Sequence, residues 1–100
     1  MEEKLKQIIN HYGVMPQLKY FQSEVFELNE AIINAENNRL VGISRKPSEL
    51  AIKHIAEEIA DVMVMLNQFR LYYGITDEEV KDIMIKKIDR QLERIKGEIC

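Results

Sequence analysis

Four carboxylates at helical spacing are the residues of this chain with the clearest potential for chemistry. Glu24 and Glu27 form one acid-x-x-acid step, and Glu58 and Asp61 form a second, each inside an amphipathic segment. Residues three apart on a helix lie on one face, about one turn apart. Like charges at that spacing repel each other unless a cation joins them. The two pairs together therefore indicate four oxygen ligands gathered around a divalent cation.

Apolar residues that recur at steps of three and four predict helices separated by short breaks. Gly13 and Pro47 lie in two of the breaks, and Pro16 suits the first position of a helix. Thr76 and Glu79 have the spacing of a capping box, which marks a further helix start. One short and three long helices are expected, at about residues 3–11, 16–37, 48–73 and from 76 onward.

The chain shows no strand-like alternation and no internal repeat, so it is predicted to be all-α. We expect a four-helix-bundle-like single domain over residues 1–100. From Ile59 to Leu66 the third helix is apolar almost all round, apart from Asp61. Such a helix is buried on more than one side, and a chain of this size has little material to cover both sides. A homo-oligomer, either a dimer or a tetramer, is therefore expected, with the third helix near its interface.

The two acidic pairs are expected to meet at one edge of the contact between the second and third helices. On each helix the acids lie on the same rotational side of the apolar stripe. The stripes consist of Leu18, Phe21, Val25, Leu28 and Ile32, and of Ile55, Ile59, Val62, Leu66 and Phe69. A short connection implies antiparallel packing, which places all four acids along one edge. Parallel packing would place the pairs on opposite edges.

The expected ligand set consists of oxygen atoms only, which suits Mg²⁺, or Mn²⁺, better than zinc. A di-iron bundle would need Glu-x-x-His on two helices, whereas His54 precedes Glu57 in the opposite order. His54 lies one turn before Glu58 and is expected at the surface or in a supporting position. The alternative interpretation of all the acids is a solvated helix surface.

Basic residues line the last predicted helix. Lys87 and Arg90 lie one turn apart and are candidates for contact with phosphate oxygens, because an acidic cluster that binds a polyphosphate needs cationic partners. The alternative is that these cations, together with Lys86 and Arg94, complement the helix dipole and pair with neighbouring acids.

Composition narrows the class of protein. A hydrophobic content of 46% with 31% charged residues is typical of an ordered domain, and a net charge of −3 gives no basic surface for a nucleic-acid polymer. No apolar run is long enough to cross a membrane, and the first residues lack a signal-peptide pattern. The only cysteine is Cys100, so an internal disulfide and a cysteine metal site are both excluded. A cytoplasmic protein is expected.

Several of these residues, in order and spacing, resemble the MazG-type nucleoside triphosphate pyrophosphohydrolases of the all-α NTP pyrophosphatase superfamily. The resemblance extends over about residues 12 to 95, and the chain differs from the common family pattern at Tyr12 and Ser23. The residues that carry the resemblance are Tyr12-Gly13, Gln17-Leu18, Glu24-x-x-Glu27-Leu28, Glu57-Glu58-Ile59-Ala60-Asp61-Val62 and Lys87-Ile88-Asp89-Arg90.

The resemblance implies a Mg²⁺-dependent enzyme that converts a (d)NTP and water to the (d)NMP and pyrophosphate. Its metal-binding and catalytic residues would be Glu24, Glu27, Glu58 and Asp61. Lys87 and Arg90 would contact the phosphates. For such an enzyme we expect the base in an apolar pocket near the start of the second helix, where Gln17 offers hydrogen bonds and Tyr20 or Phe21 a flat surface. Two alternatives stay open: a non-catalytic helical module that oligomerises or regulates a partner, and a base-specific relative such as a dUTPase- or dCTPase-like enzyme.

Overall fold

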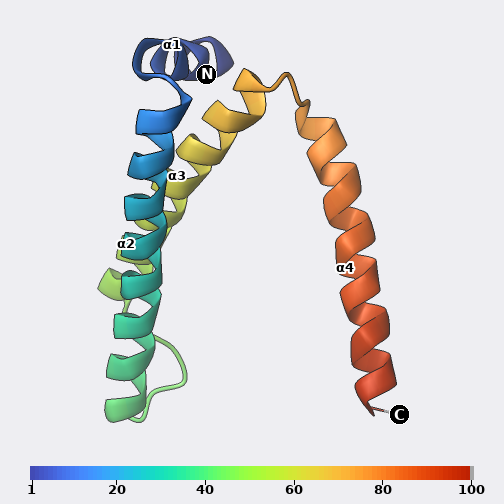
Figure 1. The fold of residues 1–100 in the computed structure, drawn as a ribbon. Coiled ribbons are helices and arrows are strands. Elements are labelled where there is room, and N and C mark those ends of the chain that lie inside the picture. The colour runs from blue at the N-terminus through green and yellow to red at the C-terminus, as the bar shows by residue number, and fades with distance from the viewer. Residues whose placement is uncertain (100) are drawn as a thin grey trace.

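The computed structural model describes residues 1–99, which form four helices and no strand, so the all-α prediction is confirmed. Cys100 lies outside the described residues. No helix in the described part of the chain is both long and apolar enough to cross a membrane. The elements in Figure 1 are α1 (Glu2–Tyr12), α2 (Val14–Val41), α3 (Glu49–Tyr72) and α4 (Asp77–Ile99).

Local signals account for most helix boundaries. Gly13, between α1 and α2, has a φ of 87°, a backbone conformation that favours glycine. The Ser48 hydroxyl accepts a hydrogen bond from the Ala51 amide at 3.2 Å and so caps α3. The Glu79 amide donates to Thr76 Oγ1 at 3.0 Å, and the Thr76 amide donates to Glu79 Oε2 at 2.9 Å. These two reciprocal bonds confirm the predicted capping box.

The α2 helix is longer at both ends than the sequence predicts. It begins two residues before Pro16, because the first amides of a helix need no intrahelical acceptor and proline is tolerated there. It also continues into the predicted loop as far as residue 41. In that last turn Arg39 Nε pairs with Glu36 at 2.8 Å, and Arg39 Nη1 donates to the Ser44 carbonyl at 2.9 Å.

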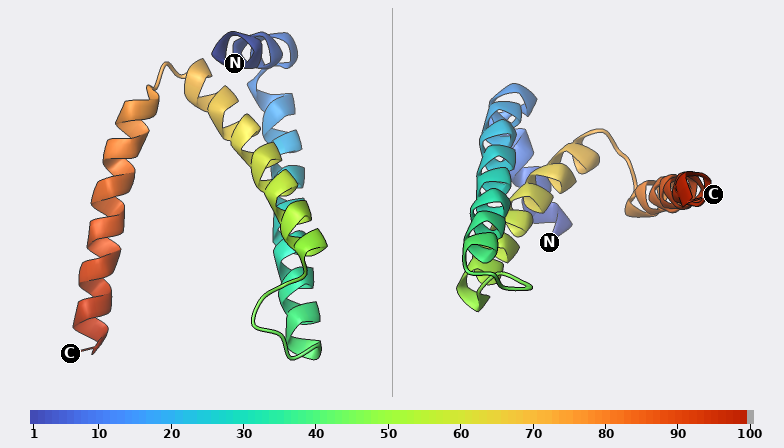
Figure 2. Two further views of the ribbon diagram at one scale, coloured as in Figure 1. Left: turned by 180° about the vertical axis from the view of Figure 1, so that it is seen from behind. Right: turned by 90° about the horizontal axis from the view of Figure 1, so that it is seen from below.

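The packed part of the molecule is formed by α1, α2 and α3. The loop of residues 42–48 joins α2 to an antiparallel α3, and α1 lies across the end of this pair (Figures 1 and 2). Phe21 and Phe69 meet edge to face with their ring centres 5.6 Å apart, which is a favourable aromatic arrangement. The buried apolar side chains are Leu5, Ile9, Ala31, Ala35 and Met65.

The α4 helix stands apart from the other three (Figures 1 and 2). Of its side chains between residues 77 and 98, Val80 is half-buried and all others are exposed. The radius of gyration is 17.3 Å, whereas a compact domain of this length has about 13 Å. The bundle-like packing within one chain is therefore limited to α1–α3. The exposed apolar stripe of α4 includes Ile83, Met84, Ile88, Leu92 and Ile95.

The contact face between α2 and α3 is rotated from the expected apolar stripes. Phe21 and Leu28 take part in it, but Leu18, Val25 and Ile32 are exposed. Small side chains on α2, and polar residues of both helices, occupy the seam instead. On α2 the seam is formed by Gln17, Phe21, Glu24, Leu28, Ala31 and Ala35, and on α3 by Ala51, Ile55, Glu58, Val62, Met65, Gln68 and Phe69.

Candidate metal centre

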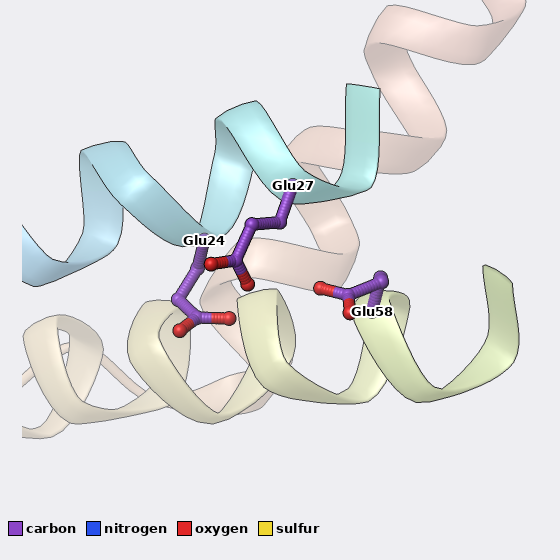
Figure 3. A group of neighbouring side chains, drawn as sticks. All are labelled: Glu24, Glu27 and Glu58. Atoms are coloured by element: carbon purple, nitrogen blue, oxygen red, sulfur yellow. The ribbon is translucent and has the colours of Figure 1, made fainter. Parts of the chain in front are cut away.

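Three of the four predicted carboxylates come together across the α2–α3 seam. Glu24 and Glu27 of α2 and Glu58 of α3 each offer an oxygen, and these three atoms lie within 4.8 Å of one another. Figure 3 shows the two α2 side chains reaching toward α3 and the Glu58 carboxylate directed toward them. Antiparallel packing therefore brings together acids that are about thirty residues apart in the sequence.

The cluster is buried more deeply than the sequence predicts. Glu24 is only 5% exposed and Glu58 only 9%, whereas Glu27 is exposed. The prediction that all four acids line an edge of the seam is therefore wrong for these two residues, which lie inside it. The cause is the rotation of both helices, which moves Glu24 and Glu58 from the flanks of the apolar stripes onto the packing face.

Two buried oxygens of this cluster have no hydrogen-bond partner within the described residues. They are Glu24 Oε2 and Glu58 Oε2. A buried carboxylate oxygen without a partner is costly, because it has lost its hydration and gained nothing in exchange. A divalent cation held by the three carboxylates would be a partner for the cluster and would offset the repulsion between its charges. The donor set therefore fits a hard cation such as Mg²⁺ or Mn²⁺.

The electrostatics of the cluster favour a proton or a cation at Glu24. Burial raises the pKa of the Glu24 carboxyl, and the charges of Glu27, Asp61 and Glu58 act in the same direction. A hydrogen bond with Tyr20 opposes this rise. The same hydrogen bond, together with the Glu24 charge, raises the pKa of the Tyr20 hydroxyl. In the absence of a cation, the site therefore retains a proton more readily than an isolated carboxylate does.

Asp61 lies near the cluster but outside the group of three. It follows Glu58 by about one turn of α3, and its charge affects the pKa of both Glu24 and Tyr20. Its side chain lines a neighbouring cavity together with Glu24. The structure therefore separates the second predicted pair: Glu58 turns toward the cluster, and Asp61 faces the cavity.

His54 sits at the outer side of the cluster. Its Nε2 atom is 4.0 Å from Glu58 Oε1, and the histidine side chain is 58% exposed. It therefore lies at the surface beside Glu58, in agreement with the sequence-based expectation.

A cavity of about 520 Å³ adjoins the acidic cluster. Both residues predicted to lie near a nucleoside, Gln17 and Tyr20, line it, as do Glu24 and Asp61. Its wall also contains Gln68, which was not among the predicted site residues, although a glutamine seven residues after Asp61 lies on the same helical face. The remaining lining residues are Ile8, Tyr12, Val64 and Met65.

The predicted phosphate-binding residues lie elsewhere in the chain. Lys87 and Arg90 share a face of α4 with Gln91 and Arg94, and this face has a shallow hollow of about 170 Å³. Since α4 stands apart from α2 and α3 (Figure 1), a single chain does not bring these cations to the acids.

Comparison of the chain with known protein families, with curated proteins and with solved structures found no match. Three carboxylates can hold a divalent cation, and the adjoining cavity can admit an organic ligand whose charged end reaches that cation.

Proposed function

We propose that this chain is a Mg²⁺-dependent nucleotide pyrophosphohydrolase that converts a (d)NTP to the (d)NMP and pyrophosphate. The observation that carries the proposal is the pair of buried, unpartnered oxygens on Glu24 and Glu58, next to a cavity large enough for a small organic ligand. The resemblance of the sequence to the MazG-type pyrophosphohydrolases supports the same reaction. Mn²⁺ is an alternative cation, because it also accepts an all-oxygen ligand set.

In the proposed reaction water attacks the α-phosphorus, and the bond from this phosphorus to the oxygen that bridges to the β-phosphate breaks. Glu24, Glu27 and Glu58 would hold the cation, which when bound polarises phosphate oxygens and neutralises developing charge. Asp61, which lines the cavity outside this group, would accept the proton of the attacking water. Gln17 and Tyr20 would lie beside the nucleoside.

We propose further that the active form is a homo-oligomer, either a dimer or a tetramer. The support is that apolar side chains seven residues apart stay exposed beside the seam, and that the stripe of α4 is exposed as well. If α4 packed against the α2–α3 pair of a second copy, both apolar surfaces would be covered, and Lys87 and Arg90 would approach the acids as phosphate ligands. The exposed seam-side residues are Leu18, Val25 and Ile32 on α2 and Ile52, Ile59 and Leu66 on α3.

A second candidate is a non-catalytic helical module that oligomerises or regulates a partner. The exposed apolar stripe of α4 favours it, since contiguous exposed apolar surface marks an interaction site. This candidate predicts no dependence of stability or activity on Mg²⁺. A third is a base-specific relative, such as a dUTPase- or dCTPase-like enzyme, which would show the same reaction with one preferred nucleotide.

The test is pyrophosphate release from a panel of canonical and modified NTPs, with Mg²⁺, with Mn²⁺ and with neither. Glu58→Gln and Asp61→Asn should abolish turnover while retaining helicity. Glu57→Gln is the matched control, because Glu57 neighbours Glu58 on α3 but is exposed and lies outside the acidic group. Retained turnover in both site variants, or no release by the wild type from any nucleotide, would contradict the proposal.

A further inference from the structure

Two buried glutamines form part of the cavity wall. Gln68 is only 1% exposed and Gln17 only 8%. The Gln17 Nε2 atom donates to Gln68 Oε1 at 2.8 Å, which joins α2 to α3. A bonded pair of this kind adds little net stability over apolar residues of the same shape. Since the pair lies on a cavity wall and adds little stability, it can serve as part of a binding site.

A third residue fixes the direction of this hydrogen bond. Gln68 Nε2 lies 3.7 Å from Met65 Sδ, and Met65 is buried. A thioether sulfur accepts hydrogen bonds and cannot donate them, so Gln68 must turn its NH₂ group toward Met65 and its oxygen toward Gln17. Gln17 must in turn give one N–H to Gln68.

The remaining polar groups of Gln17 are then defined. Its Oε1 atom and its second N–H make no hydrogen bond to another residue between positions 1 and 99. A primary amide carries two donors and one accepting oxygen. Gln17 lines the cavity and therefore keeps one acceptor and one donor in a fixed orientation, which it would not keep if its amide were free to flip.

An adjacent acceptor and donor complement the edge of a nucleobase, and glutamine pairs with such an edge through two hydrogen bonds. Tyr12 and Tyr20 line the same cavity, and tyrosine rings can offer flat surfaces for a planar ligand. Glu24 and Asp61 also line it, so a ligand with its base at Gln17 would extend its phosphates toward the acids.

We propose that Gln17 reads the base of the bound nucleotide and that Gln68, oriented by Met65, is the residue that positions Gln17. This inference rests on the proposed function for its ligand, and it adds how the site distinguishes one base from another. It predicts a preference for a base whose ring edge carries an N–H next to an acceptor. Methylation of that N–H removes the donor and clashes with Oε1.

The test compares Gln17→Met, Gln68→Met and Met65→Leu with the wild type. For each protein, kcat and KM are measured for the preferred NTP, the same NTP with its donor N–H methylated, and inorganic tripolyphosphate. We expect Gln17→Met and Gln68→Met to raise KM for the preferred NTP roughly tenfold, the loss typical of one hydrogen bond. The rise in KM for the preferred NTP should exceed the rise in KM for tripolyphosphate by a similar factor. Met65→Leu should reduce discrimination against the methylated NTP.

A control variant separates this role from a loss of stability. Ile9→Val removes a methylene from a core residue that is not part of the cavity wall, and it should keep the ratio of kcat/KM between the two NTPs. Equal losses for the preferred NTP and tripolyphosphate in Gln68→Met would show that the pair is structural and overturn the inference. An unchanged ratio in Gln17→Met would overturn it as well.

The inference and the proposed function fail in different ways. If the wild type cleaves neither NTPs nor tripolyphosphate, the proposed reaction is wrong, and base reading is then decided by calorimetry with nucleoside monophosphates, which needs no turnover. Binding weakened about tenfold by Gln17→Met would support base reading. No binding by the wild type, or binding unaffected by the variant, would overturn it.

Discussion

Replacing Glu24 by glutamine should make the metal-free protein more stable and the metal-bound protein less stable than the wild type. The carboxylate oxygens of Glu24, Glu27 and Glu58 lie within 4.8 Å of one another. Without a cation, each carries charge that the others repel. With a cation, each is a ligand. The same substitution therefore relieves repulsion in one state and removes a ligand in the other.

The distances set the size of the effect. Two unit charges 4.8 Å apart repel by about 3.5 kcal/mol at an effective dielectric constant of about 20. Protonation of Glu24, whose pKa is raised, avoids part of this cost, and solvent screens the exposed Glu27. The net gain in stability from Glu24→Gln in the metal-free state is therefore about 1–2 kcal/mol. In a domain of this size, each kcal/mol raises Tm by about 4–8 °C.

Metal binding should reverse the order of the two proteins. At a Mg²⁺ concentration 100 times its Kd, the wild type gains about 2.7 kcal/mol by mass action. The variant would lack one of the proposed ligands and should gain much less. The assay is thermal and urea unfolding at neutral pH, with EDTA and over a series of Mg²⁺ concentrations. The free energies of unfolding of the two proteins should cross as Mg²⁺ rises.

Glu30→Gln provides the control, because it removes the same charge from an exposed position on α2 and should leave both free energies close to those of the wild type. The reasoning fails if Glu24→Gln is no more stable than the wild type in EDTA. It also fails if both proteins respond equally to Mg²⁺, because the buried oxygens would then be neither strained nor ligands.

Three further predictions concern pH, helix capping and assembly. Burial and neighbouring charges raise the pKa of Glu24 above its ordinary value of 4.5, so the stability from its protonated form is fully present below about pH 4.5 and is lost as pH rises through the raised pKa. Urea titrations should show the metal-free wild type falling below Glu24→Gln over that range, and parallel profiles would contradict this. Thr76→Ala removes the acceptor of the Glu79 amide and should cost about 1 kcal/mol at the start of α4, seen as faster hydrogen exchange there; unchanged exchange would count against the cap. Ile88→Glu with Leu92→Glu places charge on the exposed stripe of α4 and should yield monomers in light scattering with α1–α3 still folded, whereas a monomeric wild type would refute the oligomer.

The helices were predictable from the sequence because their signals are local. The hydroxyls of Ser48 and Thr76 cap α3 and α4 through bonds to amides three residues later, and such contacts involve no other part of the fold. The extension of α2 past residue 37 was missed because it depends on Arg39, whose contacts with Glu36 and the Ser44 carbonyl stabilise the last turn.

The rotation of the α2–α3 seam could not be read from periodicity. A wide apolar stripe specifies which side of a helix avoids water, but it does not specify which part of that side meets a given neighbour. Ala31 and Ala35 allow the second half of α2 to approach α3 closely, and this selects the face that also carries Glu24. The sequence therefore identified three acids that meet, and missed that two of them are buried.

The same rotation explains why part of the expected apolar stripe is exposed. Leu18 and Val25 lie beside the seam and are not covered by α1 or α3, while the apolar stripe of α4 is exposed as well and stands away from the other described helices. One packing event between copies would cover both surfaces and would bring the basic face of α4 to the acids. Assembly and phosphate binding are then a single step, so a variant that prevents assembly should also raise KM for the triphosphate. A monomeric variant with wild-type KM would separate the two and exclude Lys87 and Arg90 from the site.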